Sequence, residues 1–271
     1  MTLRQSLKKF TPNPVWKLGS DAYWWWRNRG RHLLAQRTDS RWAESVHRVQ
    51  QYENTHANQR CFIIGNGPSL KNTDLSRLMG EYTFGLNRIY LLFPELGFTT
   101  TYLVLVNDLV LEQCASDLRA LALPRFLTWR SRYWFQADPN LVYLDTDFTG
   151  DEDFCTQITG RIFEGYTVTY VAMQLAFHMG FKEAILVGVD HNYVTQGEAN
   201  KAIISQGDDP NHFTPGYFGK GFKWQLPDLA GSERAYILAR EAYAQAGRRI
   251  VDATVGGKLT VFPKVDYAAL F

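Results

Sequence analysis

The chain has 271 residues, 45% of them hydrophobic and 21% charged. This is the composition of a globular protein, and the length allows one large α/β domain with additions or two small domains. No run of about 18 apolar residues is present to span a membrane, and the N-terminus lacks the apolar core of a signal peptide. Three widely spaced cysteines form neither a disulfide framework nor a zinc pattern, so we expect a cytoplasmic protein.

Charge is concentrated at the N-terminus. Residues 1–48 contain ten Lys/Arg and three acids, a net +7, so the overall charge of +2 leaves −5 for the remainder. The same stretch is rich in tryptophan, and Trp and basic side chains favour the anionic membrane interface. We predict a helical arm over residues 1–57 that binds the inner face of the membrane. The alternative is an arm packed on the core or on a second subunit of a homo-oligomer. Without a basic patch elsewhere, we expect no nucleic-acid partner.

The domain over residues 58–271 is predicted to start with a strand and a glycine-rich turn. The apolar residues 61–64 precede Gly65, Asn66, Gly67, Pro68 and Ser69. Glycines let the backbone approach a ligand closely, and successive amide groups can form an anion-binding concavity. The turn lacks both the Walker Gly-Lys-Ser/Thr ending and the full G-x-G-x-x-G fingerprint. It therefore predicts a nucleotide or phosphate site, or else an ordinary tight turn after a buried strand.

Two further predicted strands also lead into asparagine. Residues 82–86 lead to Asn87, and residues 102–106 lead to Asn107 and Asp108. In an open parallel sheet, ligands bind outside the carboxyl ends of the strands, so Asn66, Asn87 and Asn107 are expected on one rim. The amide side chain carries both a donor and an acceptor, which suits a nucleoside.

The rest of the chain alternates strands and helices. A short helix is expected at 74–79, a buried helix at 167–179 ending at Gly180, and a helix from Ser232 to Ala246 ending at Gly247. Further strands are expected at 126–129, 141–145, 184–190 and 250–253. Residues 191–230 are irregular and rich in Gly, Pro and aromatics, which is typical of an active-site lid. The pattern predicts a Rossmann-like parallel sheet with helices on both faces.

The lid supplies the candidate catalytic residues. His212 is its one histidine after residue 191 and could take a proton from a hydroxyl nucleophile, or it could merely cap or stack. Tyr193, Tyr217 and Lys220 are candidates for stabilising a leaving phosphate.

Asp190 follows a predicted strand and could bind a sugar hydroxyl or a metal, or cap a turn. With no Cys/His metal spacing, we expect no required metal cofactor, unless Asp108 or Asp190 holds Mg²⁺.

Several of these segments resemble a known family. G-N-G-P-S-L at 65–70, the asparagines at 87 and 107, and F-K-E-A-I-L-V-G-V-D at 181–190 resemble the MptE-like family, named for an archaeal 6-hydroxymethylpterin diphosphokinase. They also look like the bacterial lipooligosaccharide sialyltransferases. The second resemblance implies a Rossmann-like domain with a lid that uses CMP-sialic acid without a metal. The resemblance covers roughly residues 60–255.

The sialyltransferase resemblance implies nucleotide contacts for Asn66, Asn87 and Asn107. Tyr193 lies one position from a tyrosine that holds the leaving phosphate in that family. The family lid carries two histidines four residues apart, the second being the base, whereas here His212 is followed by Gly216. Either His212 has taken the role or the chemistry differs.

Three functions follow as hypotheses. The first is a glycosyltransferase of surface-polysaccharide synthesis that uses a CMP-activated acidic sugar and a glycan or lipid-linked acceptor. The second is an ATP- and Mg²⁺-dependent pyrophosphokinase of the MptE kind. The third is a non-catalytic nucleotide- or glycan-binding protein.

Overall fold

The computed structural model describes residues 22, 29–148, 153–194 and 197–271. The chain divides into two compact units, residues 1–44 and residues 45–271. In the first unit, α3 (Arg31–Thr38) is followed by the start of α4 (Ser40–Tyr52). Residues 1–21 and 23–28 of the predicted membrane-binding arm lie outside the described residues. No helix in the described part of the chain is long and apolar enough to cross a membrane.

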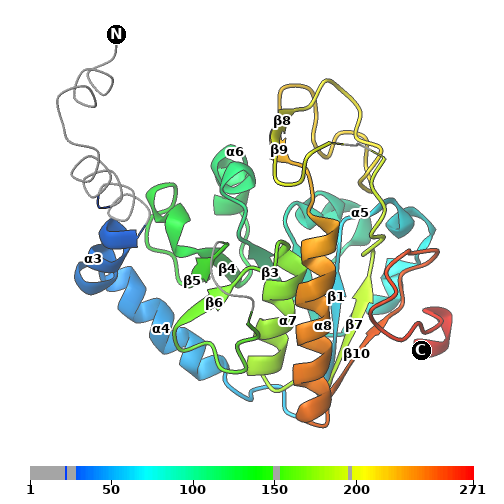
Figure 1. The fold of residues 1–271 in the computed structure, drawn as a ribbon, viewed down its shortest axis with the longest axis horizontal. Helices are drawn as coiled ribbons and strands as arrows, with labels where there is room; N and C mark the ends of the chain where they lie inside the picture. The colour runs from blue at the N-terminus through cyan, green and yellow to red at the C-terminus, as the bar shows by residue number, and fades with distance from the viewer. Residues whose placement is uncertain (1–21, 23–28, 149–152, 195–196) are drawn as a thin grey trace, which may run out of the picture. The chain divides into compact units, whose positions relative to one another are not determined.

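The larger unit is built on a parallel sheet of eight strands, which confirms the predicted Rossmann-like fold (Figure 1). Across the sheet the strands are β10 (Arg249–Asp252), β7 (Glu183–Val187), β1 (Arg60–Ile64), β2 (Thr83–Leu86), β3 (Tyr102–Leu105), β4 (Arg125–Thr128), β5 (Leu141–Asp147) and β6 (Arg161–Phe163). All seven pairings are parallel. Every predicted strand is present, because strands buried on both faces are continuous apolar runs.

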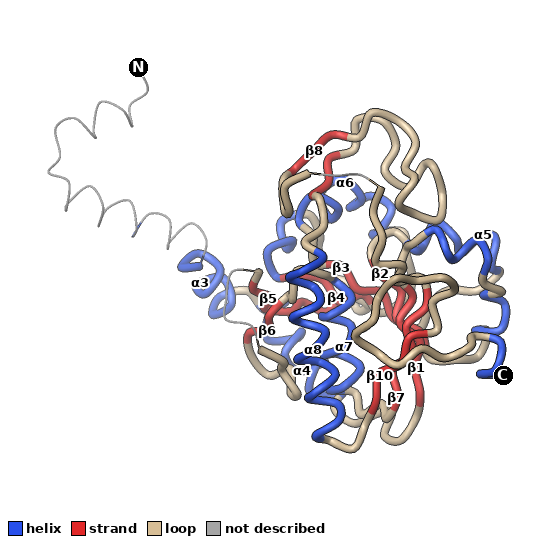
Figure 2. The backbone as a smooth tube through the Cα atoms, turned by 45° about the vertical axis from the view of Figure 1, so that its right-hand side comes forward, coloured by secondary structure: helices blue, strands red, loops and turns tan. Residues whose placement is uncertain are grey.

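Helices cover both faces of the sheet. α7 (Val168–His178) and α8 (Leu229–Gln245) pack against each other on one face, and α5 (Phe93–Leu96) and α6 (Asp108–Arg119) lie on the other (Figures 1 and 2). Ten of the eleven residues of α7 are buried, which explains its almost uninterrupted apolar sequence. The predicted start of α8 was wrong: Asp228, not Ser232, caps it by accepting a hydrogen bond from the Gly231 amide.

The strand order reverses between β1 and β7. From β1 the chain moves outward through β2 to β6, and α7 then carries it back to β7 on the other side of β1. Ligands of open α/β sheets bind at such a switch point, beyond the carboxyl ends of the strands. Here those ends carry Gly65 and Gly188, whose backbones are in contact: a Cβ added to Gly65 would lie 2.3 Å from the Gly188 carbonyl oxygen.

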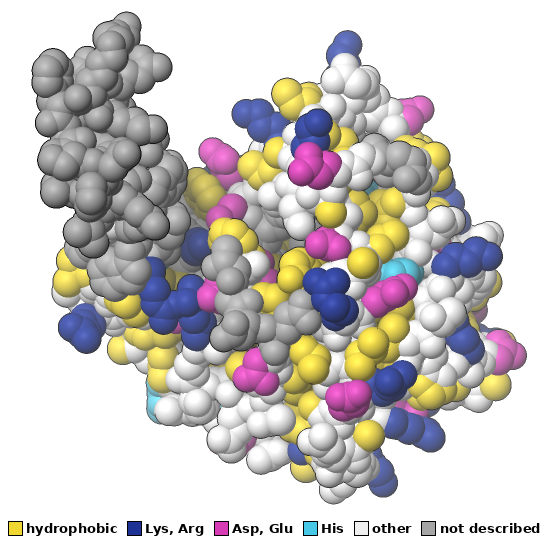
Figure 3. Space-filling model, in the orientation of Figure 1, with side chains coloured by type: hydrophobic (Ala, Val, Ile, Leu, Met, Phe, Trp, Pro, Cys, Tyr) yellow, Lys and Arg dark blue, Asp and Glu magenta, His cyan; other side chains and the backbone are white. Residues whose placement is uncertain are grey.

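The predicted lid rises from this same edge of the sheet. Its described residues, 191–194 and 197–230, are largely irregular and contain one small antiparallel pair, β8 (Ala202–Ile204) and β9 (Lys223–Gln225). Figure 1 shows the segment standing above α7 and α8. On the face drawn in Figure 3, apolar side chains with acidic ones among them gather below it.

Candidate functional site

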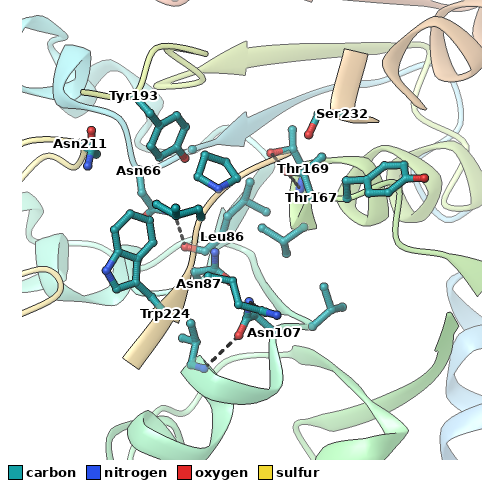
Figure 4. Close-up of a pocket in the computed structure, with 18 of the residues that line it drawn as sticks. Asn66, Leu86, Asn87, Asn107, Thr167, Thr169, Tyr193, Asn211, Trp224 and Ser232 are labelled. Carbon is teal, nitrogen blue, oxygen red and sulfur yellow. Dashed lines mark hydrogen bonds between the residues drawn. The ribbon is translucent and has the colours of Figure 1, made fainter. Parts of the chain in front are cut away.

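A cavity of about 690 Å³ lies between the carboxyl edge of the sheet and the lid. Its wall contains nine of the residues predicted for the site: Gly65, Asn66, Gly67, Asn87, Asn107, Asp108, Asp190, Tyr193 and His212. Asn66, Asn87 and Asn107 follow one another along the sheet edge, with Tyr193 and Trp224 on one side of the view and Thr167 and Thr169 on the other (Figure 4). A cavity of this size is in the range of small-molecule sites.

The glycine-rich turn is held by Asp190. Its carboxylate accepts hydrogen bonds from the Ser69 amide at 3.0 Å and the Ser69 hydroxyl at 2.6 Å. Gly67 makes this possible, because a Cβ there would lie 1.8 Å from Asp190 Oδ2. Burial raises the pKa of Asp190 above its ordinary value, and the two Ser69 hydrogen bonds oppose that shift. Asp190 therefore acts in this structure as an anchor for the turn.

This anchoring changes the interpretation of the turn as an amide cradle for phosphate. The amides of Gly65 and Gly67 donate to the carbonyl oxygens of Val187 and Gly188, at 2.7 and 2.9 Å. With the Ser69 amide bound to Asp190 and no amide hydrogen on Pro68, three of the expected donors already have partners within the protein. The turn lines the cavity mainly through its close backbone approach and the side chain of Asn66.

Two of the three asparagines present acceptors that the protein leaves unsatisfied. Asn66 donates through Nδ2 to the Leu86 carbonyl at 3.0 Å, while its Oδ1 is buried and has no hydrogen-bond partner in the described chain. Asn87 Oδ1 is likewise buried and has no hydrogen-bond partner in the described chain. The backbone of Asn87 is in the left-handed region, with φ of 47°. An unpaired buried acceptor is costly, and strained conformations cluster at functional sites, so both features indicate a ligand that donates hydrogen bonds.

Asn107 has a different role. It is the N-cap of α6: its Oδ1 accepts from the amides of Leu109 and Val110, at 3.0 and 3.3 Å, and its Nδ2 donates to Gln225 at 3.1 Å. Its position on the rim agrees with the prediction, but its acceptor is engaged in capping the helix.

Arg130 forms a partly buried charge cluster that sequence reasoning missed. Its Nε donates to the Asp108 carboxylate at 3.1 Å, one terminal nitrogen to Thr146, and the other to Glu164 at 2.7 Å and to the Val106 carbonyl at 3.2 Å. These contacts use all five guanidinium hydrogens. Burial raises the pKa of Glu164, against the lowering effect of Arg130. Arg130 thus stabilises two carboxylates and retains no donor for a phosphate.

The strongest chemical feature is a histidine paired with a carboxylate. His212 Nδ1 lies 2.7 Å from Asp209 Oδ2, and both side chains are almost fully buried. Asp209 is fixed in turn, since its Oδ1 accepts from the Asn211 amide at 2.9 Å. A carboxylate at Nδ1 favours a proton there, which leaves Nε2 as the basic nitrogen. No hydrogen bond to Nε2 is found among the described residues, and His212 lines the cavity.

Two predicted catalytic residues lie outside the cavity wall, as do Pro68 and Ser69. Tyr217 is fully buried behind His212, and its hydroxyl accepts a hydrogen bond from the Arg88 amide at 3.2 Å. Lys220 is exposed on the lid. Neither position supports the predicted contact with a leaving phosphate. Tyr193 does line the cavity, and burial raises its pKa, so its hydroxyl stays protonated near neutral pH.

The Mg²⁺ alternative has little geometric support. Asp108 is paired with Arg130, and Asp190 is bound by Ser69. Within the part of the chain that the structure describes, no three His, Cys, Asp or Glu side chains are grouped as metal ligands would be.

Among solved structures, the chain is similar to the MAf glycosyltransferase from Magnetospirillum magneticum AMB-1, with a TM-score of 0.50 at 15% identity. The match covers 84% of this chain and 39% of the neighbour, so this chain spans well under half of that protein. No family model matches the chain, and no curated protein matches it. The likeness supports the Rossmann-like fold, and the resemblance to the MptE-like family stays a prediction.

Proposed function

We propose that this protein is a glycosyltransferase that uses a nucleotide-activated sugar, with His212 as the base. The observation that carries the proposal is the Asp209–His212 pair, whose histidine lines a cavity at the switch point of the sheet. The structural neighbour, named as a glycosyltransferase, supports it at the level of the fold. As the finer proposal we favour a CMP-linked acidic sugar and an acceptor from surface-polysaccharide synthesis.

The proposed reaction assigns a role to each of five residues. His212 Nε2 takes the proton from the acceptor hydroxyl, whose oxygen attacks the anomeric carbon. The bond from that carbon to the phosphate oxygen breaks, and the electron pair leaves with the nucleotide. Asp209 stabilises the imidazolium that forms. Tyr193, a protonated hydroxyl in the cavity wall, donates a hydrogen bond to the departing phosphate. Asn66 and Asn87 accept hydrogen bonds from the nucleotide.

The first test is thermal unfolding with CMP, CDP, CTP, UDP, GDP and ATP, each with Mg²⁺ or EDTA. A ligand at about 100 times its Kd adds about 2.7 kcal/mol, or roughly 5–10 °C here. A shift with CMP that survives EDTA is the expected result. A shift only with ATP and Mg²⁺ would favour pyrophosphoryl transfer instead.

The second test is turnover, measured as release of CMP from a CMP-linked sugar. His212→Ala should lower kcat on the order of 10²-fold or more, because the acceptor proton loses its base. Nucleotide-induced stabilisation should be retained, since binding does not need the base. Wild-type turnover by the variant would end the proposal. Binding without turnover in the wild-type protein would favour a non-catalytic nucleotide-binding role.

A further inference from the structure

The lid touches the sheet at the same two loops that carry the unsatisfied asparagines. At the first, the Phe213 amide donates to the main-chain oxygen of Asn66 at 2.9 Å. At the second, Tyr217 meets Arg88, the residue after Asn87. His212 directly precedes Phe213 and lies shortly before Tyr217 in the same lid segment, so its place depends on both.

Tyr217 is the surface on which His212 rests. The two rings are stacked, with centroids 4.0 Å apart and planes only 7° from parallel. Phe218 closes the side of the imidazole at 4.9 Å, edge to face. With Asp209 holding Nδ1, the imidazole is fixed in position by Tyr217 and Phe218 and in rotation by the carboxylate.

Arg88 in turn holds Tyr217. Its amide donates to the Tyr217 hydroxyl at 3.2 Å, and its guanidinium donates to the Tyr217 main-chain oxygen. The guanidinium also lies 5.7 Å from the Tyr217 ring and 5.1 Å from the Phe222 ring. These cation–π contacts are strongest when the cation is partly removed from water, as this one is.

Arg88 makes no ion pair with a carboxylate among the described residues. Its other side-chain hydrogen bond is a long one, 3.4 Å from Nε to the Tyr90 hydroxyl. A partly buried cation needs compensation, and here most of it comes from the lid. The contact therefore favours the lid in the position that places His212 in the cavity wall.

We propose that Arg88 and Tyr217 are positioning residues for His212. They act through the lid, and Arg88 joins the His212 segment to the loop of Asn87. The inference rests on the proposed function, because the orientation of His212 matters to the reaction if His212 is the base. It assigns to Tyr217 a role different from the phosphate contact expected from sequence.

The test is a nitrogen–proton correlation spectrum of the full chain labelled with ¹⁵N-histidine, which needs no substrate. Stacking on Tyr217 should move the His212 ring protons upfield, and His212→Ala assigns the signal. Arg88→Ala should remove much of the upfield shift, and Arg88→Lys should restore part of it. Tyr217→Phe keeps the ring and should preserve the shift, whereas Tyr217→Leu should abolish it. Lys201→Ala, which removes an exposed cation of the same lid, is the matched control and should change nothing.

The two proposals fail separately. A His212 signal that is identical in the wild type, Arg88→Ala and Tyr217→Leu, all folded by circular dichroism, would overturn the positioning role and leave the turnover result untouched. Full turnover by His212→Ala would overturn the proposal that His212 is the base, whatever the spectra show. Retained upfield shift in Arg88→Ala with loss in Tyr217→Leu would remove Arg88 from the proposal and keep Tyr217.

Discussion

At the scale of single residues, the Asp209 carboxylate favours the tautomer of His212 that carries its proton on Nδ1. The contact is between residues three apart in one loop, and both are buried, so water competes little with it. The histidine was identified from sequence as one polar group in a lid-like stretch. Its partner was not, because aspartate beside proline and asparagine is also the ordinary composition of a turn.

We predict that Asp209→Asn lowers kcat on the order of 10²-fold, because a neutral amide stabilises the imidazolium less and can favour the other tautomer. KM should change much less. Steady-state release of CMP from a CMP-linked sugar measures both. Asp208→Asn, next in sequence but exposed, is the matched control. Equal kcat values in the two variants would show that Asp209 has no role in the reaction.

Arg130 and Glu164 form an ion pair whose side chains are only 17% and 11% exposed. Removing one member of a buried pair leaves an uncompensated charge, so Arg130→Met should cost about 3–5 kcal/mol of unfolding free energy. Urea unfolding measures it. Arg249→Met provides the comparison, since Arg249 pairs with Glu183 at 71% exposure and should cost less than about 1 kcal/mol. Similar losses in both would mean that the cluster contributes no more than a surface pair.

At the scale of elements, the turn between β1 and the 3-10 segment Pro68–Asn72 depends on one missing methyl group. Gly67→Ala would place Cβ against the Asp190 carboxylate and, at 2.9 Å, the Gly188 oxygen. We expect it to lower stability by about 1–3 kcal/mol, by overpacking. In an Asp190→Ala background the loss should shrink. Gly160→Ala, where a Cβ meets nothing within 4 Å, should be nearly neutral. Additive losses in the double variant would contradict the contact.

The same scale shows what could be predicted from sequence. The apolar runs that became β1, β2, β3 and β7 were clear because each is buried. The helix α6 was missed although its buried residues, such as Val110, Cys114 and Leu118, recur at helical spacing behind an N-capping asparagine. Asn107 was interpreted as a ligand residue, which hid the cap. The three-residue strands β6, β8 and β9 are too short for a periodic signal.

For the site, sequence placed three asparagines on one rim because strand ends of a parallel sheet share an edge. It could not find Arg130, Glu164 or the contact between Arg88 and Tyr217. Arg130 and Glu164 are 34 positions apart in sequence, and Arg88 and Tyr217 are 129 positions apart. Neither the residue types nor their spacing indicates these contacts.

At the scale of the whole molecule, the N-terminal segment remains the element with the clearest expected partner. Its net charge of +7 over residues 1–48 predicts binding to anionic lipid vesicles, with loss at high salt as charges are screened. Co-sedimentation with phosphatidylglycerol vesicles should capture the full chain, and phosphatidylcholine vesicles should not. A chain starting at residue 45 is the control. Equal capture of both chains would show that the arm is not what binds.

The strand order of the sheet has a consequence for synthesis of the chain on the ribosome. β1 lies between β2 and β7, yet β2 follows it within about 20 residues, whereas β7 is made only at residues 183–187. Until then one edge of the central strand, fully apolar from Cys61 to Ile64, has no partner. Such an edge is a template for pairing with another nascent chain. Chains that stall or are truncated before residue 183 should therefore aggregate, and a chaperone that shields this edge during translation should raise the yield of folded protein.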